Sequence, residues 1–282
     1  MWGKRLILGL YESWPMPYEE QLTLWKQSGF DGFFLIWNRE LDMAGIRKKA
    51  DELGLFFQSL HAPWGRAADM WHEEEEKGAE AVQELKECVD ACVSCRIPLL
   101  VVHAFVGFEE HEPTKTGLVR FGQVVDYAQQ AGVKIAFENT EGEEYLQALM
   151  DHFVGNDTVG FCWDTGHEMC YNQSKDMMAL YGNRLFGTHL NDNLGIRDFD
   201  GKITWLDDLH LLPFDGIADW DGIVERLSRY QFEGDLTFEL STVSKPDRHE
   251  NDCYGNMAPE LYIAEVYKRA CRVAAMLKRR QG

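Results

Sequence analysis

The chain has 282 residues, of which 45% are hydrophobic and 12% aromatic, enough apolar surface for one large hydrophobic core. Its 47 acidic residues outnumber its 28 lysines and arginines, and the resulting formal charge of −19 argues against nucleic acid or an anionic membrane as a partner. No apolar run is long enough for a membrane helix and residues 1–12 lack a signal-peptide pattern, so we expect a cytoplasmic protein that binds a small molecule.

Strand-like and helix-like segments alternate along the whole chain. Short apolar runs predict eight strands, at residues 5–10, 32–37, 55–60, 99–105, 134–137, 159–163, 185–189 and 236–240. Apolar positions with helical spacing predict helices at residues 18–28, 41–53, 72–94, 114–131, 143–152, 174–181, 221–229 and 260–280.

Eight such units predict an α/β fold with a parallel sheet, because each strand is apolar enough to be buried on both faces. Eight units close most naturally into a single (β/α)8 TIM barrel, which we expect to form one domain over residues 1–282. The alternative is a doubly wound open sheet, but the chain has no glycine-rich phosphate loop of the kind that such sheets use. The connection over residues 191–220 is long enough to predict a functional loop.

Three of the seven cysteines, Cys88, Cys92 and Cys95, have a spacing that raises the question of a metal site. They fall on the apolar stripe of the helix predicted at residues 72–94. We therefore expect buried, reduced core thiols.

Polar residues follow the apolar strands with unusual regularity. In the segment VGFCWDTGHE, residues 159–168, a buried run leads directly into Asp164 and His167. Five of the nine histidines lie at a strand end or in the loop after strand seven. Buried carboxylates and imidazoles need partners, which would be each other, a metal or a ligand. The remaining residues of this kind are His61, His103, Glu138, His189, Asp208, His210 and Glu239.

Four of these residues end strands five to eight, and the carboxyl ends of neighbouring barrel strands surround one point. They are Glu138, Asp164, His189 and Glu239. Three carboxylates and one imidazole predict a site for one divalent metal ion, with Mn²⁺, Mg²⁺, Co²⁺ or Zn²⁺ as candidates. The alternative for any single residue is structural, as a hydrogen-bonding histidine or a glutamate paired with an arginine.

The position of Glu138 and Glu239 on two flanks of that ion suggests a reaction. Two carboxylates facing a metal-held polyol would remove a proton from one carbon and return one to the same or the adjacent carbon. The metal would stabilise the enediolate oxygen in between. We therefore predict that these two glutamates are catalytic.

Three tryptophans follow strands one to three: Trp14, Trp37 and Trp64. They would form an apolar wall for a sugar ring, or they pack at the rim of the barrel. Glu141 and Glu144 would likewise support the site or serve as acidic residues at a helix start.

Seven short motifs together resemble the xylose-isomerase-like barrel superfamily, which includes sugar isomerases and epimerases, inosose dehydratases and endonuclease IV. The motifs are HAP at His61, VVH at His103, FEN at Glu138, WDTGH at Asp164–His167, THLND at His189, DLH at Asp208–His210 and TFEL at Glu239.

The resemblance to ketose 3-epimerases implies the same four metal ligands and the same pair of acid–base glutamates. It also implies that His167 holds a substrate hydroxyl, with Glu144 as a second candidate. The full set of predicted substrate-binding residues is His61, His103, His167, Glu144, His210, Trp14, Trp37 and Trp64.

We therefore predict a metal-dependent isomerase or epimerase of a sugar or related polyol ketone. One alternative is an endonuclease IV-like phosphodiesterase with up to three zinc ions, because every ligand type of that enzyme has a counterpart here; the acidic charge argues against it. An inosose-type dehydratase is a third candidate. A fourth candidate is a barrel that binds a sugar without catalysis. Purified protein without metal, with its strand-end carboxylates paired to arginines, would favour this candidate. A homo-oligomer would associate through apolar helix faces.

Overall fold

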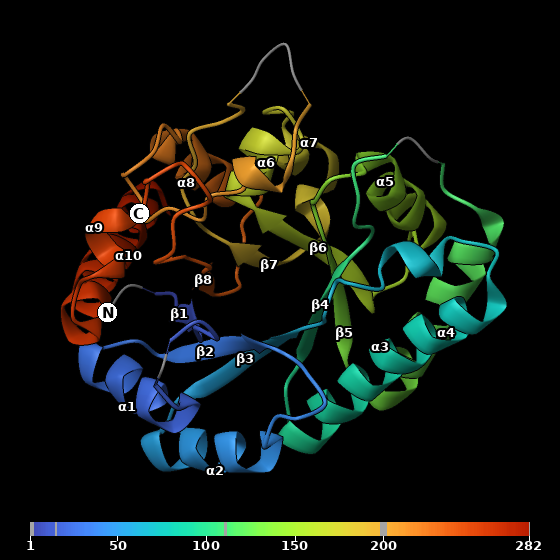
Figure 1. The fold of residues 1–282 in the computed structure, drawn as a ribbon, viewed down its shortest axis with the longest axis horizontal. Helices are drawn as coiled ribbons and strands as arrows, with labels where there is room; N and C mark the ends of the chain where they lie inside the picture. Colours follow the sequence, from blue (N-terminus) through green and yellow to red (C-terminus); the bar gives the residue numbers. More distant parts are fainter. Residues whose placement is uncertain (1–2, 15, 110–111, 198–201, 282) are drawn as a thin grey trace.

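The computed structural model describes residues 3–14, 16–109, 112–197 and 202–281. Residues 1–2 and 198–201, which belong to the N-terminal segment and to the long loop predicted at 191–220, lie outside this description. Eight parallel strands form one sheet in the order β7-β6-β5-β4-β3-β2-β1-β8 (Figure 1). The strands are β1 Leu6–Gly9, β2 Gly32–Ile36, β3 Phe56–His61, β4 Leu99–His103, β5 Lys134–Glu138, β6 Val159–Asp164, β7 Leu185–His189 and β8 Leu236–Phe238.

The sheet closes on itself where β7 meets β8. There the backbone N–H of Leu190 donates to the carbonyl of Thr237 over 2.8 Å, and Leu190 forms a parallel bridge with Phe238. A side chain supplies the next link, because the backbone N–H of Thr237 donates to the Thr188 hydroxyl over 3.2 Å. The near-closed ring with its flanking helices is a (β/α)8 TIM barrel, as predicted.

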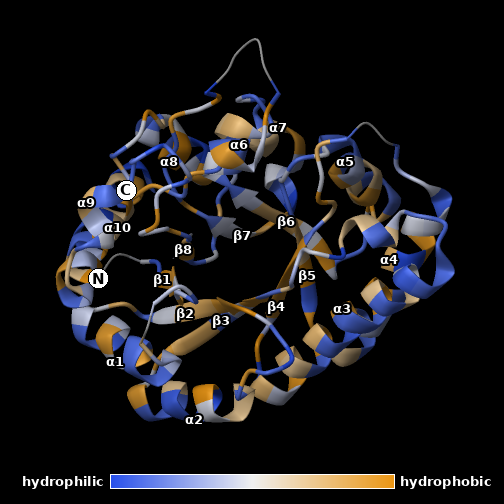
Figure 2. Ribbon diagram, viewed as in Figure 1, coloured by the Kyte–Doolittle hydropathy of each residue, from blue (hydrophilic) through white to orange (hydrophobic). Residues whose placement is uncertain are grey.

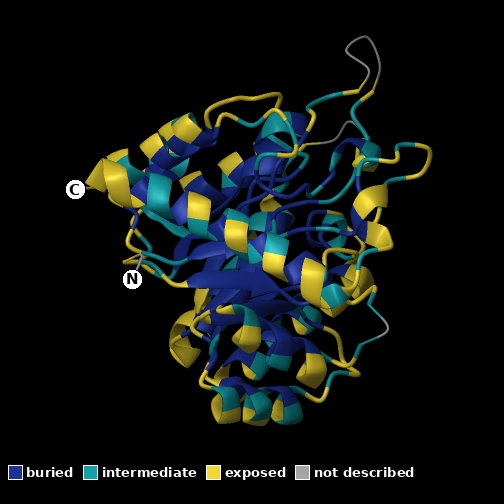
Figure 3. Cartoon of the chain, turned by 90° about the vertical axis from the view of Figure 1, so that its left-hand side faces the viewer, coloured by how far each residue is buried: buried dark blue, intermediate teal, exposed yellow. Residues whose placement is uncertain are grey.

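The long helices form an outer ring around the strands, and both chain ends lie on the same side of the molecule (Figure 1). Their polar faces point outward, whereas the strands are apolar and buried (Figures 2 and 3). The helices are α1 Tyr18–Ser28, α2 Met43–Leu53, α3 Glu75–Cys95, α4 Lys115–Ala131, α5 Glu143–His152, α6 Thr165–Cys170, α7 Met177–Tyr181, α8 Trp220–Arg229, α9 Asp252–Gly255 and α10 Pro259–Gln281.

The bounds of α1, α5 and β7 agree with the sequence-based prediction, and most other ends differ by one to three residues. Helix α7 is shorter than predicted because Asp176 caps its start, accepting a hydrogen bond from the backbone N–H of Ala179. Helices α6 and α9 were not predicted. The described residues of the long loop after β7 contain a short 3₁₀ turn at Trp205–Asp207 and an antiparallel bridge between Asp192 and Leu211.

The barrel interior is filled by small and apolar residues below the strand ends. Leu99, Val101, Ala136 and Cys162 form a cluster of their own, separate from the core between strands and helices. Phe34 also lies across the barrel, where a Cβ at Gly9 would come within 2.7 Å of its ring. Glycine at position 9 therefore leaves room for the Phe34 ring inside the barrel, beneath the carboxyl ends of the strands.

The three cysteines at positions 88, 92 and 95 are buried in α3 and unpaired, which confirms the prediction of core thiols. Among the described residues, none of the helices has an apolar stretch that could cross a bilayer.

Candidate metal centre

The residues predicted to meet at one point come together at the carboxyl end of the barrel. Side chains alternate along a strand, so the strand positions that fill the interior are followed two residues later by polar ones. Along the chain, Val101 precedes His103, Ala136 precedes Glu138, Cys162 precedes Asp164, Gly187 precedes His189, and Thr237 precedes Glu239.

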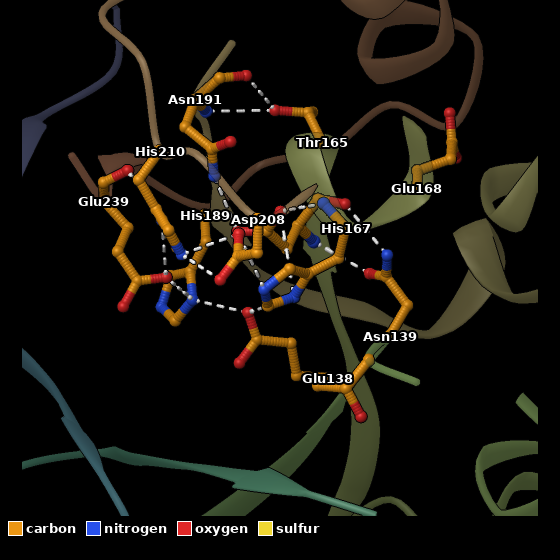
Figure 4. A network of polar contacts seen from close by, with 12 residues as sticks. Glu138, Asn139, Thr165, His167, Glu168, His189, Asn191, Asp208, His210 and Glu239 are labelled. Carbon is orange, nitrogen blue, oxygen red and sulfur yellow. Dashed lines mark hydrogen bonds and ion pairs between the residues drawn. The ribbon is translucent and has the colours of Figure 1, made fainter. Parts of the chain in front are cut away.

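The four predicted metal ligands are close to one another. One ligand atom from each of Glu138, Asp164, His189 and Glu239 lies within 4.8 Å of the others. His189 Nδ1 is 2.8 Å from Glu138 Oε1 and 3.1 Å from Glu239 Oε2, so both glutamates face the same imidazole nitrogen. The side chains of Glu138, His189 and Glu239 point into one shared space in Figure 4. The ring of His189 rests on Phe34, with the ring centroids 4.9 Å apart.

Asp164 is held in place by the helix that follows it. Its Oδ1 accepts a hydrogen bond from the backbone N–H of His167 over 2.6 Å and so caps α6. Its Oδ2 accepts from the Asn191 side chain over 2.7 Å. A Cβ at Gly166 would lie 2.0 Å from Asn191 Oδ1, so glycine is required for this close approach. Asn139 fixes the Asp164 backbone, donating to its carbonyl and accepting from its N–H, each over 2.8 Å.

Two further histidines contact Glu138 from the side of β3 and β4. His61 Nε2 and His103 Nε2 lie 3.1 and 3.4 Å from Glu138 Oε2. His61 Nδ1 is 2.7 Å from the carbonyl oxygen of Ala62, which orients the ring. These two histidines and Glu138 form a second group of closely spaced potential ligands that shares Glu138 with the first.

A third group forms where α6 meets the loop after β7. His167 Nε2 is 3.4 Å from Asp208 Oδ1, and His210 Nε2 is 3.0 Å from Asp208. The group adjoins the first, because His167 Nδ1 lies 3.6 Å from Glu138 Oε1 (Figure 4). The sequence analysis had already grouped Asp208 with His210, although neither residue ends a strand.

Histidines rather than arginines surround the carboxylates. Within the described part of the chain, Lys245 is the only lysine or arginine whose nitrogen approaches a carboxylate of the three groups, 3.9 Å from Asp208 Oδ2. An arginine would neutralise a carboxylate permanently, whereas a histidine can lose its proton and become a metal ligand. This arrangement counts against a barrel whose carboxylates serve only as structural ion-pair partners.

The histidines change the pKa values of the carboxyl groups. Burial alone would raise the pKa of Glu138, but the charge of His189 and hydrogen bonds from neighbouring imidazoles hold it well below its ordinary value. For Glu239, burial is again outweighed by the nearby histidines, which lower its pKa to about 2. Asp164 differs because burial dominates and raises its pKa to about 6.

The carboxylates change the imidazoles in turn. Burial would lower the pKa of each ring, yet the two glutamates raise that of His189 well above its ordinary value. Asp208 outweighs burial at His210 and raises its pKa to about 9. His103 is different, because burial lowers its pKa despite the nearby glutamate. Positive charge on His189 and His210 therefore offsets the carboxylates, the role that a divalent cation would fill when bound.

Unsatisfied atoms give a direct test of whether the residues fit a metal. Within the described residues, His103 Nδ1 and His167 Nδ1 are buried without a hydrogen-bond partner. Such an atom is costly unless something binds it. His167 Nδ1 lies 3.6 Å from Glu138 Oε1, so this nitrogen and the closely spaced carboxylate oxygens have the composition and burial of a metal site. His103 instead faces Glu138 with its other nitrogen, Nε2.

The other predicted substrate-binding residues differ in their distance from the histidine cluster and in their exposure. Trp64 is 41% exposed and stacks on His103, with the ring centroids 5.6 Å apart. Trp14 instead stacks on Tyr11 at 4.6 Å and donates to the Thr242 hydroxyl, and Trp37 is buried. Glu144 lies in the first turn of α5 with an exposed side chain. Of these four residues, Trp64 is the one that contacts a histidine of the cluster.

Two buried acids that the sequence analysis did not single out hold segments that follow β6 and β7. Glu168 accepts hydrogen bonds from Trp163 Nε1 and the Met177 N–H and pairs with Arg226 at 2.7 Å, and Figure 4 shows it apart from the cluster. Asp192 accepts four hydrogen bonds within or near the loop after β7. Both acids stand among other polar residues, in DTGHEMC and THLNDNLG, so the sequence did not mark either one as buried.

Solved structures of sugar epimerases share this fold. An L-ribulose 3-epimerase superimposes with a TM-score of 0.72 and 16% identity, covering 99% of this chain and 96% of that one. A D-psicose 3-epimerase from Clostridium cellulolyticum, solved with D-tagatose, gives a TM-score of 0.71 and 14% identity, covering 97% and 99%. At these identities the likeness concerns the fold alone.

Sequence relationships are closer. An uncharacterized protein, y4fM, of Sinorhizobium fredii is 30% identical over 171 residues, covering 56% of this chain and 52% of that protein, so the match spans about half of the curated relative. The family described as xylose isomerase-like TIM barrel matches residues 22–258, most of the chain. The protein therefore belongs to the xylose isomerase-like TIM barrel family.

Proposed function

We propose that the protein is a divalent-metal-dependent epimerase or isomerase of a ketose or related polyol ketone. One observation carries the proposal: Glu138, Asp164, His189 and Glu239 offer four ligand atoms within 4.8 Å at the carboxyl end of the barrel. The solved epimerases act on L-ribulose and D-psicose, which supports this substrate class.

The two glutamates would carry the proton transfers. Both face His189 Nδ1, at 2.8 and 3.1 Å, so a substrate held beside them would meet one carboxylate on each side. One glutamate would remove the proton next to the carbonyl, and the other would return a proton to the same carbon or, after isomerisation, to its neighbour. The low pKa values of both glutamates keep them ionised, so one can accept the substrate proton. The other would first take a proton from solvent and then deliver it to the carbon, which is why exchange with solvent is expected. A bound divalent cation would supply Lewis-acid polarisation of the substrate oxygens.

The surrounding groups would position the substrate. Asp164 is fixed by the helix cap and by Asn191, so it would hold its ligand oxygen in one place. His167 and His210 would bind hydroxyl groups through their ring nitrogens, and Trp64 would cover an apolar face of the sugar beside His103.

Proton exchange with solvent tests the proposal directly. We expect the purified protein with Mn²⁺ in D₂O to exchange the hydrogen next to the carbonyl of at least one of L-ribulose, D-psicose and D-tagatose, followed by NMR, and to form the epimer or isomer. Protein stripped with EDTA should lose the exchange and regain it when Mn²⁺ is restored. Absence of exchange with all three ketoses in the Mn²⁺-loaded protein would contradict the assignment.

A second candidate, a phosphodiesterase that uses several zinc ions, is favoured by one specific observation. The three groups of potential ligands adjoin each other, and Glu138 contributes to two of them. The charge of −19 argues against a nucleic-acid substrate. Lys245 alone among the described lysines and arginines approaches the cluster, so a phosphate backbone would find little positive charge there.

Metal content separates the two candidates. We expect about one divalent ion per chain by elemental analysis after purification without chelators, because one group offers three carboxylates and a histidine to a single ion. The variant Asp164→Asn should lower this content, whereas Asp221→Asn on the exposed surface should not. About three zinc ions per chain, each lost with one ligand group, would instead favour the phosphodiesterase.

A further inference from the structure

A cavity of about 660 Å³ opens at the end of the barrel opposite the candidate metal centre. Its lining comes from the amino ends of the strands: Arg5 precedes β1, Phe56 begins β3, Leu99 begins β4 and Lys134 begins β5. The loop between α8 and β8 and the turn before β7 complete the wall. The volume lies within the range of small-molecule sites.

Two aromatic side chains that line this cavity, Phe186 and Tyr230, pack directly against glycines. A Cβ at Gly160 would lie 2.3 Å from the ring of Phe186, and a Cβ at Gly182 would lie 2.7 Å from that of Tyr230. Both rings therefore lie flat against the backbone. Phe186 also packs on the interior cluster that includes Val101, so it closes the barrel between the cavity and the metal centre.

Two hydrogen-bond donors line the cavity, the exposed Lys134 ammonium and the Gln58 amide. The Lys134 ammonium lies 4.5 Å from the centroid of Phe186, and within the described residues no carboxylate is in ion-pair distance of it. Gln58 is only 6% exposed, and its Oε1 accepts from the Ser59 hydroxyl over 2.5 Å. The Gln58 amide nitrogen donates no hydrogen bond within the described part of the chain, and Gln58 lines the cavity, so this donor is available to a ligand there.

The acidic groups at this end do not satisfy those donors. Asp235 accepts two hydrogen bonds from Arg5, over 2.8 and 3.1 Å, and the guanidinium stacks on Phe56 at 3.7 Å. Glu233 is exposed at the rim. Positive charge and an amide donor thus remain available beside aromatic walls, which favours a ligand with an anionic acceptor group and an apolar ring.

We propose that this cavity binds a small ring-bearing organic anion, with its carboxylate or phosphate on Lys134 and Gln58 and its ring against Phe186 and Tyr230. The anionic group would satisfy the two free donors, and the ring would cover apolar surface that the cavity leaves open to water. The site is separate from the proposed sugar chemistry, because Phe186 and the residues packed on it lie between the two.

The test uses the full chain and two probes, phenyl phosphate and benzoate, which distinguish a phosphate from a carboxylate ligand. We expect saturable binding of at least one probe by calorimetry, with a dissociation constant of about 1 mM or lower. Lys134→Gln should weaken that binding about tenfold, the effect of one charge-assisted hydrogen bond. Lys86→Gln is the matched control, since Lys86 also lies over an aromatic ring, that of Tyr127 at 5.6 Å, but on α3 outside the cavity.

Two further probes and one further variant test which parts of the ligand the cavity recognises. Inorganic phosphate and phenol, each lacking one half of the probe, should bind more weakly than phenyl phosphate. Gln58→Leu should weaken the probe as well, and circular dichroism would verify that each variant is folded. Absence of saturable binding by both probes, or equal affinity in the wild type and in Lys134→Gln, would overturn the proposal.

Discussion

Glu138→Gln and Glu239→Gln are each expected to lower solvent-proton exchange at the substrate carbon by at least about 10²-fold, the usual contribution of a positioned acid–base group. Glutamine keeps the size of the side chain but cannot accept the proton. Both carboxylates contact His189 and carry strongly lowered pKa values, so in the wild type they are ionised at neutral pH.

The two variants should differ in metal binding. Glu138 contacts histidines from β3, β4, α6 and β7, whereas Glu239 contacts His189 and His210. Glu138→Gln should therefore weaken metal binding more than Glu239→Gln, and ligand binding should survive in both. The measurement is deuterium incorporation by NMR at saturating Mn²⁺, together with calorimetric affinity for the ketose.

Glu143→Gln serves as the control for both variants. Glu143 lies shortly after Glu138 in the chain but pairs with Lys175 outside the cluster, so exchange should stay close to that of the wild type. Wild-type exchange in either Glu138→Gln or Glu239→Gln would refute the assignment of two bases.

Asp192→Asn should destabilise the protein by about 3 kcal/mol, because buried N–H groups would lose their acceptor. Oδ1 of Asp192 accepts from the N–H groups of Asn193 and Ala218, each over 2.9 Å. Its Oδ2 accepts from the Phe214 N–H over 2.9 Å and from Trp220 Nε1 over 2.8 Å. An asparagine would turn an NH₂ group toward two of these donors.

The free energy of unfolding from urea titration measures this effect. Asp219→Asn is a suitable control because Asp219 caps α8 through one hydrogen bond to Gly222 at the surface, and asparagine also caps helices well. Asp219→Asn should lower the free energy of unfolding by less than about 0.5 kcal/mol. A change of similar size in both variants would show that the Asp192 hydrogen bonds do not hold the loop.

The sequence allowed the barrel and most of its strands to be predicted because the relevant signals are local. A run such as residues 159–163 is apolar on both faces, and only a parallel sheet covered by helices buries both. The site was then predicted from the polar residues that follow these apolar runs, such as Asp164 after residues 159–163. The four closely spaced ligand atoms agree with that expectation.

Features that depend on long-range packing could not be predicted in the same way. Thr165 and Gly166 are weak helix formers, so α6 was missed; the Asp164 cap begins this helix, and the approach of Asn191 requires its glycine. The cavity at the other end of the barrel depends on aromatic residues from distant segments. Exposure is equally non-local, and Trp14, Trp37 and Trp64 look alike in sequence although the fold buries them to different degrees.

The junction between β7 and β8 has a consequence for how the barrel holds together. One isolated bridge, between Leu190 and Phe238, joins these strands, whereas β6 and β7 have four paired positions. The Thr188 hydroxyl adds a link by accepting a hydrogen bond from the Thr237 N–H. His189 and Glu239 stand directly above this junction, one from each side. An ion bound by both residues would connect β7 and β8 where the strand pairing is weakest. Metal binding would therefore activate the enzyme and stabilise the closure of the barrel at the same time.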